Sequence, residues 1–204
     1  MAVVTAPPPG NPLRMVAPPS DEQLLARHAA GERLALDELF QRYRQPAYRV
    51  AHRLLGNEAD ALDAVQDGFV KVLTHLPAFE GRSAFKTWLL RVVSNAALDL
   101  GRQRGRRSAA EPASGENRSE TADGPLVWDD PTLGLERADL RRRLDAALAR
   151  LPEPQRQTFV LHVEADLSYR EIAEALGISI GTVMSRLYYA RQKLRAILAP
   201  LVRS

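Results

Sequence analysis

Two groups of side chains in this sequence are suited to holding nucleic acid. The first lies near the C-terminus, where positions 175–204 contain five basic residues and no acidic one. A surface of one sign attracts polyanions such as DNA. A plain solvated helical face is the alternative, because most charge runs are no more than that. The five basic residues are Arg186, Arg191, Lys193, Arg195 and Arg203.

The second group mixes aromatic rings with cations. Positions 82–107 hold seven basic residues against one acidic residue, and the rings of Phe79, Phe85 and Trp88 lie at the start of this stretch. Proteins hold single strands in this way, because bases stack on rings while Arg and Lys follow the phosphates. We expect Phe85 to pack in the core and Trp88 to serve both purposes. Phe79 follows Pro77 in a loop and is the better candidate for meeting a base.

Catalytic chemistry is not indicated. The four histidines show no metal-ligand spacing, and the aspartates at 60, 63 and 67 have no His or Glu partner grouped for a reaction. The absence of cysteine removes disulfides, thiolate catalysis and Cys-based zinc sites, and suits a reducing compartment. We therefore predict no enzyme activity, no cofactor and no metal.

The net charge of the 204-residue chain is only +3, so its basic character is local. No stretch approaches the roughly 18 apolar residues of a membrane span, and the N-terminus lacks a basic segment followed by an apolar run. These observations predict a soluble, cytoplasmic protein without membrane insertion.

The C-terminal cations lie on the second helix of a predicted helix-turn-helix. Ser168 and Glu171 have the spacing of a capping box at the start of the first helix. Gly177 fits the left-handed residue that reverses the chain after it. Ser179 caps the second helix, whose buried stripe is Val183, Leu187, Leu194 and Leu198.

The rest of the chain also has helical periodicity and no useful strand pattern. Helices are expected over about 20–31, 34–55, 58–75, 84–104 and 132–151, with another after Pro152 and Pro154. We expect Pro46 to kink or break the second of these, and Gly101 to end the fourth early. Predicted inward-facing residues include Ala61, Leu62, Val65, Phe69, Val72 and Leu73, then Leu133, Leu140, Leu144, Ala147, Leu148 and Leu151, and finally Phe159, Val160 and Val163.

The predicted fold class is all-α, with two small helical domains joined by a flexible acidic linker. Residues 1–19 hold six of the fourteen prolines and predict a disordered tail. Residues 20–107 form the first domain and residues 132–204 the second. The segment 108–131 between them is rich in Ser, Gly, Pro and Ala, with six acids to one base over 108–130, as is typical of a linker.

Residues 60–107 (DALDAVQDGFVKVLTHLPAFEGRSAFKTWLLRVVSNAALDLGRQRGRR) and 151–198 (LPEPQRQTFVLHVEADLSYREIAEALGISIGTVMSRLYYARQKLRAIL) together resemble the extracytoplasmic-function (ECF) sigma factors of bacteria. The resemblance implies a protein that binds core RNA polymerase, directs it to promoters and assists promoter melting. The first domain would correspond to sigma region 2 and the second to region 4. The implied partners are the β′ clamp and β flap of the polymerase, promoter DNA and an anti-sigma factor.

The resemblance also assigns roles to three groups of residues. The strip that docks on the polymerase is Asp63, Gln66, Asp67 and Phe69. The residues that hold a flipped base and the non-template strand of the −10 element are Phe79, Lys86, Trp88, Arg91 and Asn95. The residues directed to the major groove of the −35 element are Thr182, Ser185, Arg186, Tyr189 and Arg191.

The sequence departs from the family at positions 184 and 189, where members often carry a basic residue and this chain has Met184 and Tyr189. The alternative reading is a helix-turn-helix regulator that binds duplex DNA without being a polymerase subunit. The 60–107 block favours the sigma factor, because such a regulator needs neither a flipped-base loop nor an acidic docking helix.

Overall fold

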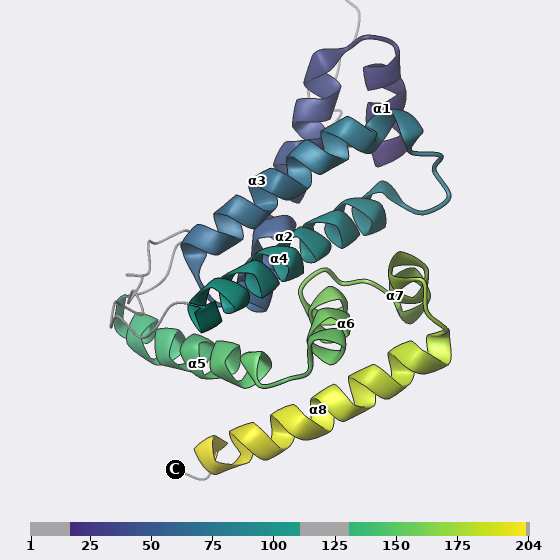
Figure 1. The fold of residues 1–204 in the computed structure, drawn as a ribbon. Coiled ribbons are helices and arrows are strands. Elements are labelled where there is room, and N and C mark those ends of the chain that lie inside the picture. The colour runs from purple at the N-terminus through teal and green to yellow at the C-terminus, as the bar shows by residue number, and fades with distance from the viewer. Residues whose placement is uncertain (1–16, 111–130, 203–204) are drawn as a thin grey trace, which may run out of the picture. The chain divides into compact units, whose positions relative to one another are not determined.

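The computed structural model describes residues 17–110 and 131–202 (Figure 1). These residues form eight α-helices and one short 3-10 helix, and among them there is no strand. The predicted all-helical class is confirmed. The chain divides into two compact units, residues 1–39 and 40–204. None of the helices in the described ranges is long and apolar enough to cross a membrane.

The helices follow the boundaries that capping and periodicity predict, with a few exceptions. In chain order they are α1 (Asp21–Ala29), α2 (Arg33–Leu55), α3 (Glu58–His75), the 3-10 helix η1 (Leu76–Ala78), α4 (Phe85–Ala110), α5 (Pro131–Ala149), α6 (Glu153–Val163), α7 (Tyr169–Leu176) and α8 (Ile180–Val202). The predicted tail (1–19) and linker (108–131) lie almost wholly outside the described residues.

Helix α1 begins at a complete capping box. The Ser20 hydroxyl accepts a hydrogen bond from the Gln23 backbone N–H at 3.3 Å, and the Gln23 side chain accepts one from the Ser20 N–H at 2.9 Å. Two of the N–H groups that lack a partner within the helix are satisfied in this way. Leu24 is the buried residue of this helix.

Helix α2 runs without a break through Pro46, so the predicted division into two helices is wrong. Proline removes one backbone hydrogen bond and crowds the preceding turn, a cost of about 3 kcal/mol. Buried residues lie on both sides of it, at Tyr43, Ala47 and Val50. Burial of these side chains offsets the local cost and keeps the helix continuous.

Helices α3 and α4 pack closely along each other (Figure 1). A Cβ on Gly68 of α3 would lie 2.8 Å from Cγ2 and 3.1 Å from Cα of Val93 in α4. Only glycine allows the two backbones to approach this closely without a shift. Ala61, Ala64, Leu90 and Ala97 are buried with them, and small residues again dominate.

Helix α4 continues past Gly101 to Ala110, so the expected early end is wrong. A glycine inside a helix costs roughly 1 kcal/mol relative to alanine. Ion pairs hold the following turn: Arg102 pairs with Asp99 at 2.6 Å and with Glu153, and Arg104 pairs with the buried Asp60. These contacts stabilise the helix beyond the glycine.

Helices α5 and α8 share a hydrophobic cluster in the C-terminal part of the chain. Its buried members are Ala147, Leu148 and Leu151 together with Ala190 and Leu194. Leu144, Phe159, Ile197 and Leu198 pack against it from the edge. The cluster packs against the C-terminal half of α8. In the N-terminal half of α8, the side turned away from the buried Val183 and Leu187 is exposed to solvent.

Four residues predicted to face inward are instead exposed: Leu62 and Leu73 on α3, Leu140 on α5 and Val163 on α6. The buried side of α3 contains Ala61, Ala64, Val65, Gly68 and Val72. Because a helix turns 100° per residue, Leu62 and Leu73 lie together on a flank, about 110° from the middle of that buried side. Likewise α6 buries Val160 and Leu161, which leaves Val163 outside.

Candidate nucleic-acid and polymerase interfaces

An aromatic cluster forms where the loop after η1 meets α4. The Phe79 ring lies 4.8 Å from the Trp88 ring at an interplanar angle of 30°, and 5.9 Å from Phe85 in an edge-on contact. Phe85 is buried and also contacts Tyr43 of α2 at 5.9 Å. The prediction that Phe85 belongs to the core is therefore confirmed, while Phe79 and Trp88 remain half-buried at the surface.

Pro77 and Gly81 determine the path of the loop. Pro77 lies inside η1, and Phe79 follows this helix in an extended conformation. Gly81 then adopts a φ of +68°, a region that favours glycine. These two devices bring Phe79 back over α4 onto Trp88, one turn into that helix.

The surface members of the cluster line a pocket of about 440 Å³. Its lining combines the two aromatic residues with Arg82, which pairs with Glu80, and Arg91, and includes Glu174 and Ala175 of α7. Ring faces beside cations fit a base and its phosphate. The lining residues are Ala78, Phe79, Glu80, Arg82, Ser83, Thr87, Trp88, Arg91, Glu174 and Ala175.

The structure brings together three of the five residues assigned to the −10 element, namely Phe79, Trp88 and Arg91. The other two do not line the pocket. The Lys86 ammonium donates to the Asp166 carbonyl at 3.5 Å. Asn95 is exposed two turns further along α4 and accepts a hydrogen bond from the Gln157 side chain at 2.9 Å.

Arg82 and Thr87 are pocket residues that the assignment to the −10 element omitted. Arg82 could have been found from the sequence, since it belongs to the same basic run as Arg91. Thr87 is buried and gives no such signal. Its hydroxyl donates to the Glu171 carboxylate at 3.2 Å.

The acidic strip on α3 is exposed, as a docking surface requires. Asp63, Gln66 and Asp67 all face solvent, and Asp67 pairs with Lys71 at 2.7 Å. Phe69 differs, because its ring is half-buried and stacks on Phe40 of α2 at 4.8 Å. It therefore anchors α3 to α2 more than it offers a free face.

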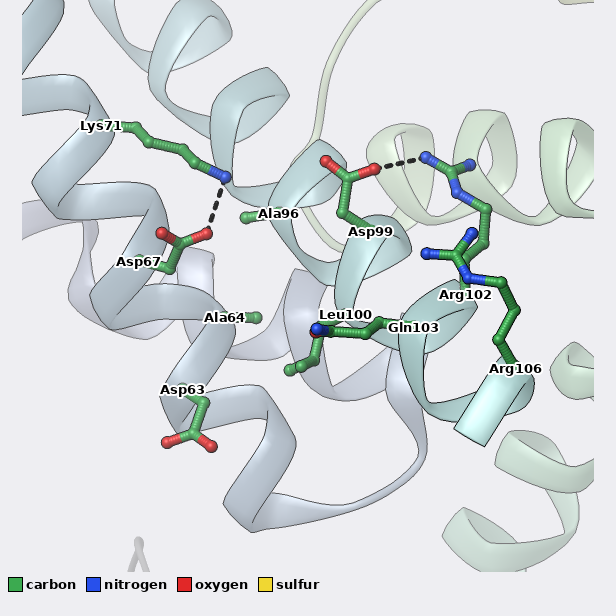
Figure 2. A pocket seen from close by; sticks show the side chains of 10 residues that line it. All are labelled: Asp63, Ala64, Asp67, Lys71, Ala96, Asp99, Leu100, Arg102, Gln103 and Arg106. Atoms are coloured by element: carbon green, nitrogen blue, oxygen red, sulfur yellow. Dashed lines mark hydrogen bonds and ion pairs between the residues drawn. The ribbon is translucent and has the colours of Figure 1, made fainter. Parts of the chain in front are cut away.

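A second pocket, of about 560 Å³, lies between α3 and α4 beside this strip. Figure 2 shows the Lys71–Asp67 pair on the α3 wall and the Arg102–Asp99 pair on the α4 wall. Asp63 belongs to this pocket and Gln66 does not. The lining residues are Asp63, Ala64, Asp67, Lys71, Ala96, Asp99, Leu100, Arg102, Gln103 and Arg106.

Helices α7 and α8 form the predicted helix-turn-helix. Ser168 and Glu171 make the capping box, with the Ser168 N–H donating to Glu171 at 2.9 Å. Gly177 has φ +63° and ψ +38°, the left-handed conformation that ends α7. Ser179 accepts from the Thr182 N–H at 3.1 Å at the start of α8. Each of these sequence predictions is confirmed.

The charge of Glu171 matters to this turn. Its hydrogen bond from the Ser168 hydroxyl is the main cause that lowers the pKa of the Glu171 carboxyl below its ordinary value, with smaller contributions from Thr87 and Lys86. Burial of the side chain opposes this shift and is outweighed. The carboxylate therefore stabilises the start of α7 in its ionised form.

The residues assigned to the −35 element divide between two sides of α8. Thr182, Ser185, Arg186 and Tyr189 recur at a spacing of three to four and share one face. Arg191 is exposed but lies about 200° from Tyr189 around the helix, on the other flank. The hydroxyls of Thr182 and Ser185 are engaged locally, with Ser179 and with the Thr182 carbonyl.

Tyr188 is a surface residue of α8 that sequence reasoning left out. Its side chain is 57% exposed, equal to Tyr189, and the two rings meet edge-on at 5.4 Å. A helical projection from the buried Leu187 places Tyr188 on the outer side and could have found it. Within the described ranges there is no group of His, Asp and Glu residues that could hold a metal ion.

Comparison with known proteins agrees with this architecture. The sigma-70 region 2 family matches residues 39–107, and the sigma-70 region 4 family matches residues 141–194. The ECF RNA polymerase sigma factor SigE of Mycolicibacterium smegmatis is 36% identical over 89% of this chain and 70% of its own length. The RNA polymerase sigma-H factor of Pseudomonas aeruginosa is 31% identical over 93% of this chain and 99% of its own.

Solved structures show the same fold. CnrH in complex with the cytosolic domain of CnrY superimposes with a TM-score of 0.66 and 29% identity, over 88% of this chain and 97% of that one. Both halves of the chain thus match, in the same order, proteins of one kind. The chain belongs to the sigma-70 family of RNA polymerase sigma factors, in its ECF class.

Proposed function

We propose that this sigma factor divides promoter recognition between a base-holding pocket on α4 and a reading face on α8. As a sigma factor it binds core RNA polymerase and directs promoter-specific initiation. Residues 20–107 would form the melting domain and residues 132–204 the upstream-element domain. The matched family ranges, 39–107 and 141–194, fall inside these limits.

The pocket around Phe79, Trp88 and Arg91 carries the proposal. Unstacking a base from the duplex costs a few kcal/mol, and a strand opens only where that cost is offset. The two stacked rings supply a surface for the extruded base, and Arg82 and Arg91 supply charge for its phosphates. We assign this pocket to an unpaired base of the non-template strand in the −10 element.

Lys86 and Asn95 extend the same strand-binding surface along α4. They are not among the residues that line the pocket, so their proposed role is to follow the backbone beyond the captured base. Asn95 is held by Gln157 in the structure, and this hydrogen bond must open before Asn95 contacts DNA. The Lys86 ammonium makes a long hydrogen bond to the Asp166 carbonyl.

We assign the outer side of α3 to the polymerase β′ clamp. Asp63, Gln66 and Asp67 are exposed there, and Leu62, Val70 and Leu73 are 45–54% exposed on the same helix. A protein interface needs desolvated apolar area as well as charge, and this surface provides both. Phe69 stabilises this surface by stacking on Phe40 of α2.

Helix α8 is assigned to the major groove of the −35 element. Its bounds contain four basic residues and no acidic one, and the capped N-terminal turns leave Thr182, Ser185, Arg186 and Tyr189 on one face. The second helix of a helix-turn-helix reads base edges with its N-terminal residues. Arg191 would reach the phosphates at the flank of the groove.

The chain acts as a specificity subunit without catalytic activity of its own, and it works in the cytoplasm, where the promoter DNA is. An anti-sigma factor holds it inactive, and the β flap of the polymerase supports the upstream-element domain. The related CnrH has been solved with the cytosolic domain of CnrY bound, which supports a regulatory partner here.

The test of the pocket is open-complex formation by the variant Phe79→Ala in a holoenzyme with core polymerase. Loss of one base stack should cost about 1–3 kcal/mol, so strand opening falls while binding to the duplex upstream element is retained. Permanganate footprinting reports the opened bases. Phe79→Trp keeps a ring and should keep activity, whereas Phe79→Leu keeps only apolar volume and should not. Normal opening by Phe79→Ala would refute the assignment.

A further inference from the structure

The surface of α4 that is assigned to the single strand is covered by α6 and α7, which pack against it. Two side chains with a proposed role at the −10 element are engaged there: Lys86 donates to the Asp166 carbonyl at 3.5 Å, and Asn95 accepts from Gln157 at 2.9 Å. The lining of the aromatic pocket also includes Glu174 of α7. Another part of the same chain therefore occupies the place of the strand.

Three ion pairs join the covering elements to arginines of α2 and α4. They are Arg53–Asp145 at 2.7 Å, Arg53–Glu164 at 2.8 Å and Arg102–Glu153. The guanidinium group binds carboxylate and phosphate oxygens with the same geometry. These carboxylates therefore offer the arginines the kind of ligand that a nucleic-acid backbone would offer. We call Asp145, Glu153 and Glu164 the acidic cover.

The centre of this contact is shielded from water. The side chains of Arg53, Asp145 and Glu164 are between 15% and 19% exposed. Gln157 is buried as well, and its side chain donates to the buried Ser94 at 3.1 Å. Shielded charged hydrogen bonds are stronger than exposed ones. A strand that binds α4 must therefore displace a packed interface and not a loose one.

The covered arrangement does not fit a single promoter. Helix α7 belongs to the helix-turn-helix assigned to the −35 element, yet it lines the pocket assigned to the −10 element. The positions of the two elements lie about 25 base pairs apart, which is roughly 85 Å of duplex at about 3.4 Å per base pair. Helix α7 must therefore leave α4 before both elements are bound. Positions 111–130, which connect α4 to α5, can bridge up to about 70 Å, so the connection allows this separation.

We propose that the acidic cover holds α6 and α7 over the strand-binding surface of α4 in the free chain, as an intramolecular substitute for the single strand. The proposal rests on the assignment of the α4 pocket to the −10 element and adds the regulation of that site. When only a fraction of the molecules is open, the apparent affinity for a ligand is reduced by that fraction. The cover therefore keeps the free sigma factor from binding single strands away from the polymerase.

The experiment measures binding of the full chain, without core polymerase, to a fluorescent single strand by anisotropy at fixed salt. The probe is the non-template strand, over the −10 region, of a template on which the holoenzyme initiates. Glu164→Gln removes a carboxylate from Arg53 and Arg49 and leaves α4 unchanged. It should bind the probe about tenfold more tightly, because the open fraction rises. Glu153→Gln breaks the more exposed pair with Arg102 and should gain about threefold.

Asp139→Asn is the matched control for the change in net charge. Asp139 lies on α5, as Asp145 does, but it pairs with Arg142 and Arg143 within the same helix. Removing its charge should leave the affinity for the probe at the wild-type value, because the acidic cover is intact.

A second readout follows the position of the cover directly. The chain has no cysteine, so Gln45→Cys on α2 and Ala149→Cys on α5, both at exposed positions, accept a pair of dyes. Energy transfer between them should be high in the free chain. It should fall when the probe is added, and it should already be lower in the Glu164→Gln background.

The outcomes separate this proposal from the one on which it rests. Equal affinity of the wild type and Glu164→Gln for the probe would overturn the acidic cover and leave the pocket assignment intact. So would an equal gain by Asp139→Asn, or low energy transfer in the free wild-type chain. If no variant bound the probe even where energy transfer is low, the pocket assignment would fail, and the cover of a strand-binding surface would fail with it.

Discussion

At the scale of single residues, the structure separates side chains that are accessible at the surface from those that support them. Phe79 and Trp88 share a half-buried stack, whereas Phe85 beneath them is in the core. The same distinction holds on α8, where Tyr189 is well exposed and Arg186 is half-buried against the helix. The residue types predicted which side chains could hold nucleic acid, and the burial of each side chain shows whether it is accessible at the surface or packed beneath it.

Arg186 provides a test at this scale. Each Lys or Arg that neutralises a phosphate releases a counterion, so the variant Arg186→Ala should bind the −35 duplex more weakly and lower the slope of log K against log salt by about 1. The measurement is fluorescence anisotropy over a salt series. Arg150→Ala, an exposed arginine outside α8, is the control and should leave the slope unchanged. An unchanged slope for Arg186→Ala would mean that this side chain contacts no phosphate.

At the scale of helices, residues that cap a helix predicted its ends correctly, whereas helix-breaking residues inside a helix did not predict where it ends. Ser20, Ser168, Gly177 and Ser179 predicted four helix ends, because each supplies a hydrogen bond or a backbone conformation that the end requires. Pro46 and Gly101 predicted interruptions that do not occur. Their costs are a few kcal/mol at most, and buried neighbours or ion pairs exceed them.

The inward-facing side of each helix was predictable only in part. Leu62 and Leu73 match the periodicity of α3 loosely and are exposed, because Gly68 brings α4 against a neighbouring side. The sequence of α3 alone does not predict that contact, since it depends on Val93 in another helix. The resemblance to the family grouped Asn95 with Phe79, whereas the structure holds Asn95 against Gln157 and outside the pocket lining.

The cap of α7 gives a prediction in pH. The pKa of Glu171 is lower in the folded protein than its ordinary value of 4.5, so the folded state holds fewer protons near that pH and this group favours folding as pH rises. Its stabilisation is complete above about pH 4.5 and is lost as pH falls through the lowered pKa. Glu171→Gln keeps the capping geometry but not the charge.

We therefore expect Glu171→Gln to be less stable than the wild type at pH 7 by about 0.5–1 kcal/mol, as is typical of a carboxylate at a helix start. The difference should shrink as pH falls below 4.5. Urea unfolding followed by circular dichroism at several pH values measures it. A difference that stays constant down to pH 3 would contradict the role of the charge.

At the scale of the whole molecule, contacts within residues 40–204 join segments far apart in the sequence. Arg53 of α2 donates to Asp145 of α5 at 2.7 Å and to Glu164 after α6 at 2.8 Å. Burial alone would lower the pKa of Arg53, and the two carboxylates outweigh it and raise the pKa. Charged hydrogen bonds that are partly shielded from water are stronger than exposed ones.

Arg53→Ala should therefore destabilise the protein by about 1–3 kcal/mol, because two carboxylates lose their partner. Chemical denaturation of the full chain measures this loss. Arg143→Ala is the matched control: Arg143 pairs with Asp139 on α5 in a largely exposed geometry and should contribute only about 0.3 kcal/mol. Equal losses for the two variants would show that the Arg53 contacts carry no special stability.

The central claim is that one chain supplies both a strand-holding pocket and a duplex-reading helix to the polymerase. Run-off transcription with sigma-free core polymerase and a randomised promoter pool tests it most directly, with core alone as the control. The account predicts defined start sites on templates that share two separated elements. Site-selective initiation on no template, despite a folded chain, would contradict it.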